Sequence, residues 1–512
     1  MQIVTSDFTA KAQGFMRRLV TRALMSFPKD YDPSVGFFTI GVSTIGGADI
    51  IKGSGDVVAE WDKFQYDDYS YRLKSIEVTR QEEMVNSTTL AQADFTFENH
   101  DNYFTPSRGS AIEDLILPYR PVKLYGGFGT EAIPQFTGIT EKMPTIDESN
   151  KVASFHAIDF MYSLFNRPLD QAVMYEDKRT DEILADLLVQ FGISPTQYSF
   201  DAGFNIVKFA FFDKGSKFGD VVKELMEAEM GRFYMDEQGT ILFKNRQNYS
   251  SSPVWFFNET NILDIQTSKQ DDIINVVTVK ANVREVQAKQ KYWELQSAVV
   301  IPANGTVDVW ADFNDPVTTA DEPDYITTAT TSLYTTNTAE DGSGSNVASG
   351  ISIASTLFAK SYLMTYTNAN AYPVYLTSIE LYATPALVVK QIYVRYQDDE
   401  SVGKYDERVL DIENDFISNE SDAASKAQII IDDYSAYANQ FELTVKGNPA
   451  LQIGDAVNVS VWGSAANYII IKTVNRWEAG KFTQRLTVRK KVFRTFFTVG
   501  VSTIGGSDVI AP

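Results

Sequence analysis

Two histidines, His100 and His156, are the only imidazole bases that this chain could use for catalysis. A Ser-His-Asp site would need one of them, and no Gly-x-Ser-x-Gly elbow accompanies either. His156 lies in the strand-like sequence Phe155-His-Ala-Ile158, which is typical of a hydrogen-bonded structural histidine. A zinc site also requires histidine or cysteine ligands at close spacing, which the sequence lacks. We therefore expect no catalytic residue, no metal ligand and no cofactor, and hence no enzyme.

A glycine-rich loop at Gly126-Gly-Phe-Gly129 could in principle cradle a phosphate group. It lacks the Lys-Ser/Thr pair of a P-loop, and no helical pattern follows it. We expect a simple turn at this place.

Carboxylates offer two further kinds of chemistry, glycan hydrolysis and calcium binding. A glycosidase needs two carboxyl groups at a set separation in a cleft, which the sequence cannot fix. Asp312-Phe-Asn-Asp315 and Asp321-Glu-Pro-Asp324 could hold calcium, but neither has the spacing of an EF-hand loop. We expect these carboxylates to face water. Trp310 and the Tyr, Asn and Asp residues around it would suit a sugar-binding face or, equally, a sandwich with its rings in the core.

The composition limits the classes of partner. Asp and Glu outnumber Lys and Arg by 67 to 45, giving a net charge of −22. Such a surface does not favour nucleic acid or anionic lipid, because phosphate groups are bound through cations. The chain has no cysteine, which excludes disulfides and thiolate chemistry. No apolar run is long enough to span a membrane, and Arg17, Arg18 and Arg22 interrupt any secretory signal. We expect a soluble protein made in the cytoplasm.

The first thirty residues are predicted to form one basic amphipathic helix that ends before Pro28. Such a helix would dock on its own domain, a partner groove or a membrane surface. Its apolar side chains recur at helical spacing: Phe15, Met16, Leu19, Val20, Ala23, Leu24 and Phe27.

Two segments near the ends of the chain are almost the same. Residues 37–51 read FFTIGVSTIGGADII and residues 496–510 read FFTVGVSTIGGSDVI, with twelve of fifteen positions identical. Each is predicted to form two short strands around a Gly-Gly turn. These twin segments either dock on partner proteins or cover the edges of their own domains. The residues that would carry docking are Phe37, Phe38, Gly46, Gly47, Phe496, Phe497, Gly505 and Gly506.

The chain between them is predicted to be mainly β, with α+β modules. Helical spacing predicts a helix that begins at Thr180 and stops at Gly192, a second from Lys217 to Met230, and a third from Ser421 to Tyr437. From Tyr292 to Ala359 there is no Lys or Arg, which marks an inserted, turn-rich β domain. We expect these units: residues 1–60 with the helix and first twin segment; 61–175, a barrel-like β domain; 176–250, an α+β module; 251–300 plus 396–492, a second barrel-like domain; 301–395, the insertion; and 493–512, the second twin segment.

Three stretches, taken in order, resemble the phage tail and baseplate hub family. That family includes contractile-tail hubs, siphophage tail-associated proteins and the first half of type VI secretion spikes. The resemblance covers about residues 64–300 and 396–492, and it lies in the order of the motifs. The stretches are Pro121–Gly129 with Phe136–Ile139 and Phe155–Leu164; Thr180–Leu188 with Phe218–Val222 and the hairpin through Leu242; and Gly447–Val459.

The resemblance implies two tail-tube-type β domains per subunit and a homotrimer that matches a sixfold tail tube. It implies a structural hub of the tail tip, in contact with the tail tube, distal tail proteins and the tape-measure protein. DNA would pass through without specific binding during genome ejection and host cell entry. The protein would belong to the virion after assembly in the host cytoplasm. The alternatives are a tail-tip protein that binds host glycan through residues 301–395, and a tail-associated glycan hydrolase.

Overall fold

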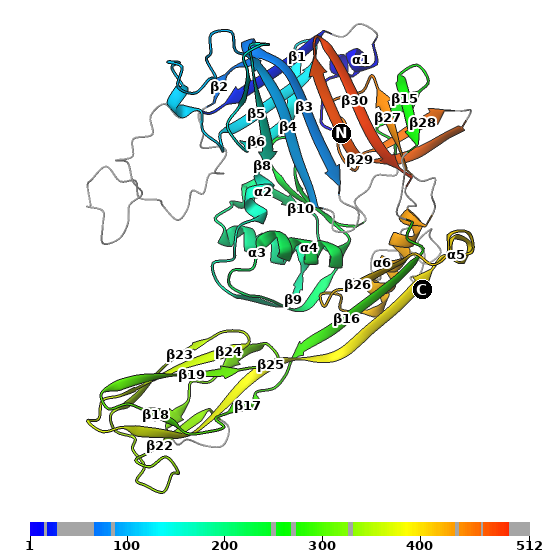
Figure 1. Cartoon of the computed structure of the whole chain (residues 1–512). Helices are drawn as coiled ribbons and strands as arrows, with labels where there is room; N and C mark the ends of the chain where they lie inside the picture. The colour runs from blue at the N-terminus through cyan, green and yellow to red at the C-terminus, as the bar shows by residue number, and fades with distance from the viewer. Residues whose placement is uncertain are drawn as a thin grey trace.

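The computed structural model describes residues 1–14, 18–27, 66–82, 88–246, 252–267, 273–325, 331–435, 440–461 and 464–490. These residues form three bodies in a row, each around its own apolar core (Figure 1). A large β body stands at one end, an α+β body lies in the middle, and a second β body projects at the other end. In the described part of the chain, no helix has the length and apolar character needed to cross a membrane.

The first body is one large sheet built from both ends of the chain. Its central join is the antiparallel pairing of β3 (Leu73–Glu82) with β29 (Ser464–Glu478), in which Thr79 lies opposite Val474. The other strands are β1 (Leu19–Met25), β2 (Asp67–Asp68), β4 (Thr88–Glu98), β5 (Pro121–Phe128), β6 (Glu131–Thr140), β7 (Thr145–Asp147), β8 (Val152–Asp159), β10 (Tyr198–Phe200), β12 (Arg232–Met235), β13 (Ile241–Lys244), β14 (Trp255–Asn258), β15 (Ile262–Thr267), β27 (Gln440–Val445), β28 (Ala456–Val461) and β30 (Lys481–Arg489).

The pairings of this sheet form a branched, open chain. From β1 they pass through β5, β6, β8, β4 and β3 to β29, and then through β30 and β27 to β15. The mainly β prediction is confirmed, but the described strands do not close into the expected barrels by hydrogen bonding. Alternation along β4 and β8 places Phe95, Phe97 and Phe155 on one buried face of the sheet, and Phe104 from the loop after β4 packs against these rings.

The single helix predicted for the first thirty residues is wrong. Helix α1 covers only Ser6–Gln13, and Leu19–Met25 is strand β1, paired with β5 along seven residues. The apolar spacing that suggested a helix is also compatible with a strand that has one partly buried face. Pairing with β5 settles the choice, because a tertiary sheet overrides weak local propensity. Thr5 begins α1 by accepting a hydrogen bond from Phe8 N (3.1 Å).

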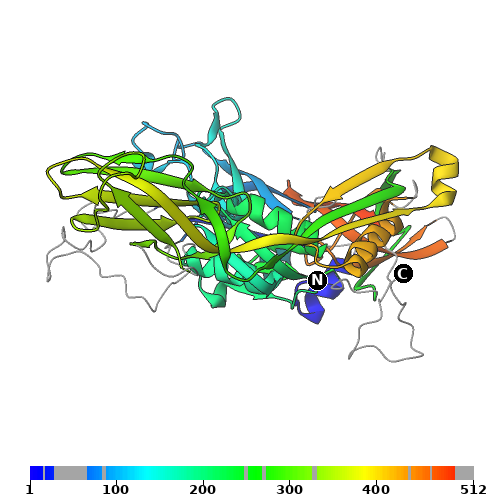
Figure 2. The ribbon, with the colours of Figure 1, turned by 90° about the horizontal axis from the view of Figure 1, so that it is seen from below.

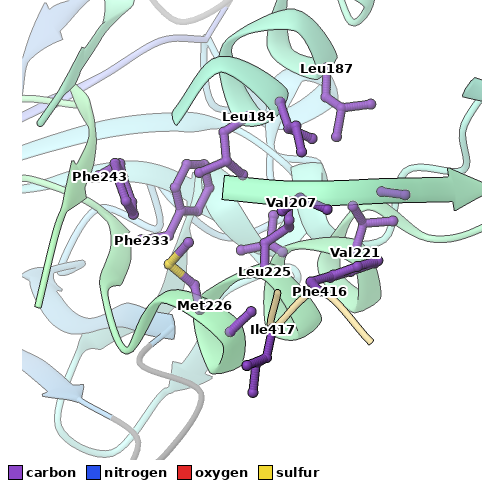
Figure 3. Close-up of a cluster of buried hydrophobic side chains, with 14 of the residues drawn as sticks. Leu184, Leu187, Val207, Val221, Leu225, Met226, Phe233, Phe243, Phe416 and Ile417 are labelled. Atoms are coloured by element: carbon purple, nitrogen blue, oxygen red, sulfur yellow. The ribbon is translucent and has the colours of Figure 1, made fainter. Parts of the chain in front are cut away.

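The middle body packs helices against short strands. It contains α2 (Phe160–Phe165), α3 (Thr180–Gln190) and α4 (Phe218–Glu229), with β9 (Val173–Arg179) paired to β11 (Ile206–Phe212). Both predicted helices are confirmed; Gly192 has a φ of +76°, and Met230 ends α4 in the left-handed region. Thr180 is the first buried residue of α3 rather than its cap. Figure 3 shows the two helices meeting β11, β12 and β13 through Leu184, Leu187, Val207, Val221, Leu225, Met226, Phe233 and Phe243.

One long strand joins the middle body to the projecting one. Strand β25 (Val374–Gln397) pairs along its second half with β16 (Val276–Val286), which also pairs with β26 (Val409–Glu413). Helix α6 (Glu420–Tyr434), close to its predicted bounds, packs beneath this ribbon, and α5 (Asp399–Tyr405) lies at its end (Figure 2). Phe416 and Ile417, which precede α6, extend the same core toward α4 (Figure 3).

The first half of β25 belongs to the projecting body. It pairs with β17 (Gln290–Glu294), β18 (Val299–Ile301), β20 (Val317–Ala320) and β22 (Leu333–Asn337), the last of which carries β21 (Asp324–Tyr325). A second sheet of β19 (Gly305–Asp312), β24 (Ser361–Asn368) and β23 (Ile351–Leu357) packs on it. The core between the two sheets includes Tyr334, Tyr362, Met364, Tyr366 and Leu376.

Candidate functional site

The eight residues predicted to dock on partners lie outside the described part of the chain. They are Phe37, Phe38, Gly46, Gly47, Phe496, Phe497, Gly505 and Gly506. Their docking role stays a prediction.

The two histidines occupy different surroundings. His156 lies on β8 with its Nδ1 2.8 Å from Asp94 Oδ1, on the neighbouring strand β4. Its Nε2 is 4.0 Å from Glu141, beyond hydrogen-bond distance, so the bond to Asp94 orients the ring. His100 is exposed in the turn after β4. The bond to Asp94 gives His156 the structural, hydrogen-bonded setting that its strand-like sequence predicted.

The glycine loop is divided between a strand and a turn. Gly126 and Gly127 belong to β5, and Gly129 has a φ of +70° in the turn to β6. A Cβ at Gly126 would lie 2.3 Å from the indole of Trp477, so this glycine makes room for a large buried ring. A turn was expected for all four residues, but only the last part of the sequence forms one.

The carboxylates of the projecting body are partly held in ion pairs. Asp315 Oδ1 lies 2.6 Å from Arg284, and Asp321 Oδ2 lies 2.7 Å from Lys289. These two carboxylates therefore face basic side chains from β16 and from the segment between β16 and β17. We had expected them to face water. Within the described residues, no three His, Asp or Glu side chains lie close enough to hold a metal ion.

A buried polar junction brings the three stretches of the family resemblance together. Arg80 of β3 donates from Nη1 to the Met235 carbonyl (2.8 Å), and its Nε lies 3.4 Å from Glu237 Oε1. Glu237 is also bonded by Gln452 Nε2 at 2.6 Å, and its carbonyl accepts from Thr137 Oγ1 at 2.9 Å. The hairpin turn of the second stretch is thus tied to β6 of the first and to the loop of the third.

A chain of side-chain amides continues the junction into β29 and β30. Gln135 Nε2 donates to the Pro449 carbonyl (3.2 Å), and Gln135 Oε1 accepts from Asn475 Nδ2 (3.0 Å). Gln484 Nε2 then donates to Asn475 Oδ1 (2.8 Å), while Gln484 Oε1 accepts from Asn448 N (3.0 Å). Amides satisfied at both ends specify one register, because a shifted pairing would leave buried polar atoms without partners. No sequence pattern indicated this network, because its members are far apart along the chain.

Three other buried groups have an altered pKa. Burial raises the pKa of the Asp159 carboxyl to about 6, although its Oδ2 accepts from Ala91 N at 2.7 Å. Burial lowers the pKa of Lys426 on α6 to about 7, and it raises the pKa of Glu229 on α4. Glu229 accepts from Asn205 N (2.7 Å) and Phe204 N (3.0 Å), which fixes the loop before β11. These groups are enclosed in cores, so we assign them to folding rather than to chemistry.

The aromatic residues of the projecting body could form a sugar-binding face or a core, and their exposure shows which of them lie in the core. Tyr334, Tyr362 and Tyr366 are buried in the core. Trp310 is 51% exposed and stacks on Phe358, which is 40% exposed, with ring centroids 5.7 Å apart and planes at 26°. Phe358 was not singled out from the sequence, because its position beside Trp310 depends on the pairing of β23 and β19 with β24.

No protein-family model and no curated protein matches this chain. Among solved structures, the chain is similar to the 43 kDa tail protein of prophage MuSo2 from Shewanella oneidensis, at 12% identity over 84% of this chain and 96% of that one, with a TM-score of 0.45. A tail protein from Neisseria meningitidis MC58 is 9% identical over 84% and 94%, with a TM-score of 0.46. Prophage tail protein gp18 from Listeria monocytogenes EGD-e is 11% identical over 84% and 94%, with a TM-score of 0.42. All three are described as tail proteins, the kind of protein that the three stretches of this chain resemble.

Proposed function

We propose that the chain is a structural hub subunit of a phage-type tail tip or baseplate. The observation that supports this most is the buried polar junction, at which the three resembling stretches meet. Each stretch alone is ordinary strand-and-turn sequence, and the resemblance rests on their order. They converge where Glu237 of the second stretch accepts hydrogen bonds from Thr137 of the first and Gln452 of the third, which indicates that they act as one structural unit.

In this proposal the subunit assembles as a homotrimer and connects the tail tube with the distal tip and the tape-measure protein. It lines part of the conduit through which DNA passes, and it resides in the tail of the virion after assembly in the host cytoplasm. The excess of acidic residues suits such a wall, because like charges prevent DNA from adhering. The twin segments serve as docking surfaces for neighbouring tail proteins.

The hub role is not enzymatic. What supports this is the setting of His156, which is hydrogen-bonded to Asp94 on the neighbouring strand. Glycan binding by the 301–395 segment is a separate second function, which the exposed pair Trp310 and Phe358 favours.

The assembly state tests the hub proposal directly. Light scattering of the purified full chain, alone and with co-expressed tail proteins, is expected to give three times the subunit mass of 57.3 kDa. A strict monomer at high concentration, with and without those partners, would overturn the proposal.

A further inference from the structure

The outer face of the sheet β23–β24–β19 exposes apolar rings on a polar, uncharged or acidic surface. Alternation along β19 places Val309 and Ala311 in the core and leaves Asp308, Trp310 and Asp312 outside. On the next strand, Leu363 lies opposite Trp310 in the register, and Phe358 N closes the turn by donating to the Ser361 carbonyl at 2.8 Å. The two rings therefore form one continuous platform at the end of the sheet.

We propose that this platform binds a neutral polysaccharide. A sugar ring has an apolar C–H face, which packs on an aromatic ring, and a rim of hydroxyl groups that need polar partners. The same face provides such partners, since Asp308 and Thr365 lie side by side with a hydrogen bond of 2.6 Å between them. Half-exposed rings beside oriented oxygen atoms meet both requirements of the ligand.

Charge selects a neutral ligand over an anionic one. The strands β19, β23 and β24 carry no Lys or Arg, and Asp308 and Asp312 flank Trp310 on the exposed face, while Lys360, in the turn after Phe358, lines the hollow beside the platform. Acidic glycans, phospholipid headgroups and nucleic acid all carry anionic groups that this surface repels. A second copy of the chain would bring the same acidic residues to the face and is disfavoured for the same reason.

The turn that carries Phe358 also borders a hollow of about 450 Å³. Lys360, two residues further on, lines this hollow, as do Glu224, Glu413 and Asp415. Asp415 Oδ1 already accepts from Asn282 N at 2.9 Å, so this carboxylate is held in place. A hollow of this volume can take a sugar residue, and carboxylates are strong acceptors for its hydroxyl groups. We assign it to the next part of the same polysaccharide chain.

This inference rests on the second function proposed above, glycan binding by residues 301–395, and adds its ligand class; binding of only the acidic polymer would overturn the neutral class and leave glycan binding standing, and neither result bears on the hub function. The test is electrophoresis of the full chain through native gels that contain dextran, mannan or galactan, with polygalacturonate as the acidic comparison. At least one neutral polymer is expected to retard the chain. Trp310→Ser and Phe358→Ser should each weaken that retardation about tenfold. The matched control is Tyr372→Ser, since Tyr372 is 47% exposed on the same body but lies away from the platform in sequence.

A second readout follows the ring itself. Oligosaccharide from the retarding polymer should protect Trp310 from acrylamide quenching, and a Trp310→Phe variant should lose this protected signal while it still binds. The proposal is overturned if no neutral polymer retards the folded chain, if both Ser variants bind as well as the native protein, or if polygalacturonate is bound most tightly. It is also overturned if light scattering shows that the Ser variants dissociate an oligomer, since the platform would then be an interface between copies.

Discussion

At the scale of single residues, the surroundings of His156 define a structural role. Its hydrogen bond to Asp94 crosses from β8 to β4 on a half-exposed face of the sheet. A bond of this kind between exposed groups contributes little, because water competes for both partners.

Replacing both histidines by Gln should therefore leave the stability and the assembly of the protein nearly unchanged. We expect the free energy of unfolding of His100→Gln/His156→Gln to change by less than about 1 kcal/mol, measured by urea denaturation. Tail assembly should proceed as with the native protein. Virions that assemble normally but lose cell-wall degradation mapped to this protein would contradict the assignment.

Asp159 makes stability depend on pH. Burial raises its pKa from 3.8 to about 6 on folding, so between these values the folded chain holds more protons than the unfolded chain. The free energy of unfolding should consequently fall as pH rises from about 4 to 6, by up to about 3 kcal/mol, and this contribution should be constant above that window.

Comparison with Asp159→Asn isolates this effect. The amide keeps an oxygen acceptor for Ala91 N but cannot ionise, so the difference from the native protein should grow through the same pH window. Urea denaturation at pH 4.5 and pH 7 measures it. Asp312→Asn, which changes an exposed carboxylate, is the control and should keep the native slope. An unchanged slope in Asp159→Asn would rule out this residue as the cause.

At the scale of elements, local sequence and long-range pairing differ in what they decide. Helices α3, α4 and α6 follow their apolar spacing, because one face of each packs on a core. The segment Leu19–Met25 does not, because β5 offers a partner for seven residues. The hairpin β12–β13 joins the large sheet through a short pairing with β4, and Arg80 of β3 adds a second link by its bond to the Met235 carbonyl.

Removing Arg80 should loosen that hairpin. Arg80→Ala leaves the buried Glu237 without its cationic partner, and we expect a loss of about 3–5 kcal/mol in the free energy of unfolding. The double variant Arg80→Ala/Glu237→Gln should recover part of this loss, because the uncompensated charge is gone. Arg476→Ala is the matched control, since its ion pair with Glu77 is exposed and should be worth less than about 1 kcal/mol. Equal losses in Arg80→Ala and Arg476→Ala would show that the junction adds nothing.

At the scale of the whole molecule, the twin segments carry the prediction about assembly. Replacing Phe37-Phe38 and Phe496-Phe497 by Ser, separately and together, removes the apolar anchors of the proposed docking surfaces. Each variant should keep its circular dichroism spectrum and its oligomeric mass but fail to join tails, and the combined variant should be the most defective.

Tyr71→Ser, at a 72% exposed aromatic residue elsewhere, provides the control and should assemble normally. Normal tail assembly by a well-folded combined variant would refute docking through these segments. The hub proposal would survive that result, because it rests on the buried junction and has the trimer mass as its own separate test.

The sequence alone determined the mainly β class, the three longer helices and the strand that carries His156. These features depend on neighbours within a few turns or one strand, where spacing of apolar residues carries the information. The twin segments and the cation-free stretch were also visible directly, as identity and composition.

Only the tertiary structure decided which strands pair and which faces are exposed. The pairing of β3 with β29 joins residues almost four hundred positions apart, and together with the pairings of β6 it brings Arg80, Gln135 and Asn475 near the loop of Gln452. Likewise, alternation along β19 predicts two faces but not which one faces the core; packing against β25 buries Tyr334 and Tyr366 and leaves Trp310 outside. Local sequence cannot encode these outcomes, because a strand has the same period whichever partner it meets and whichever of its faces is covered.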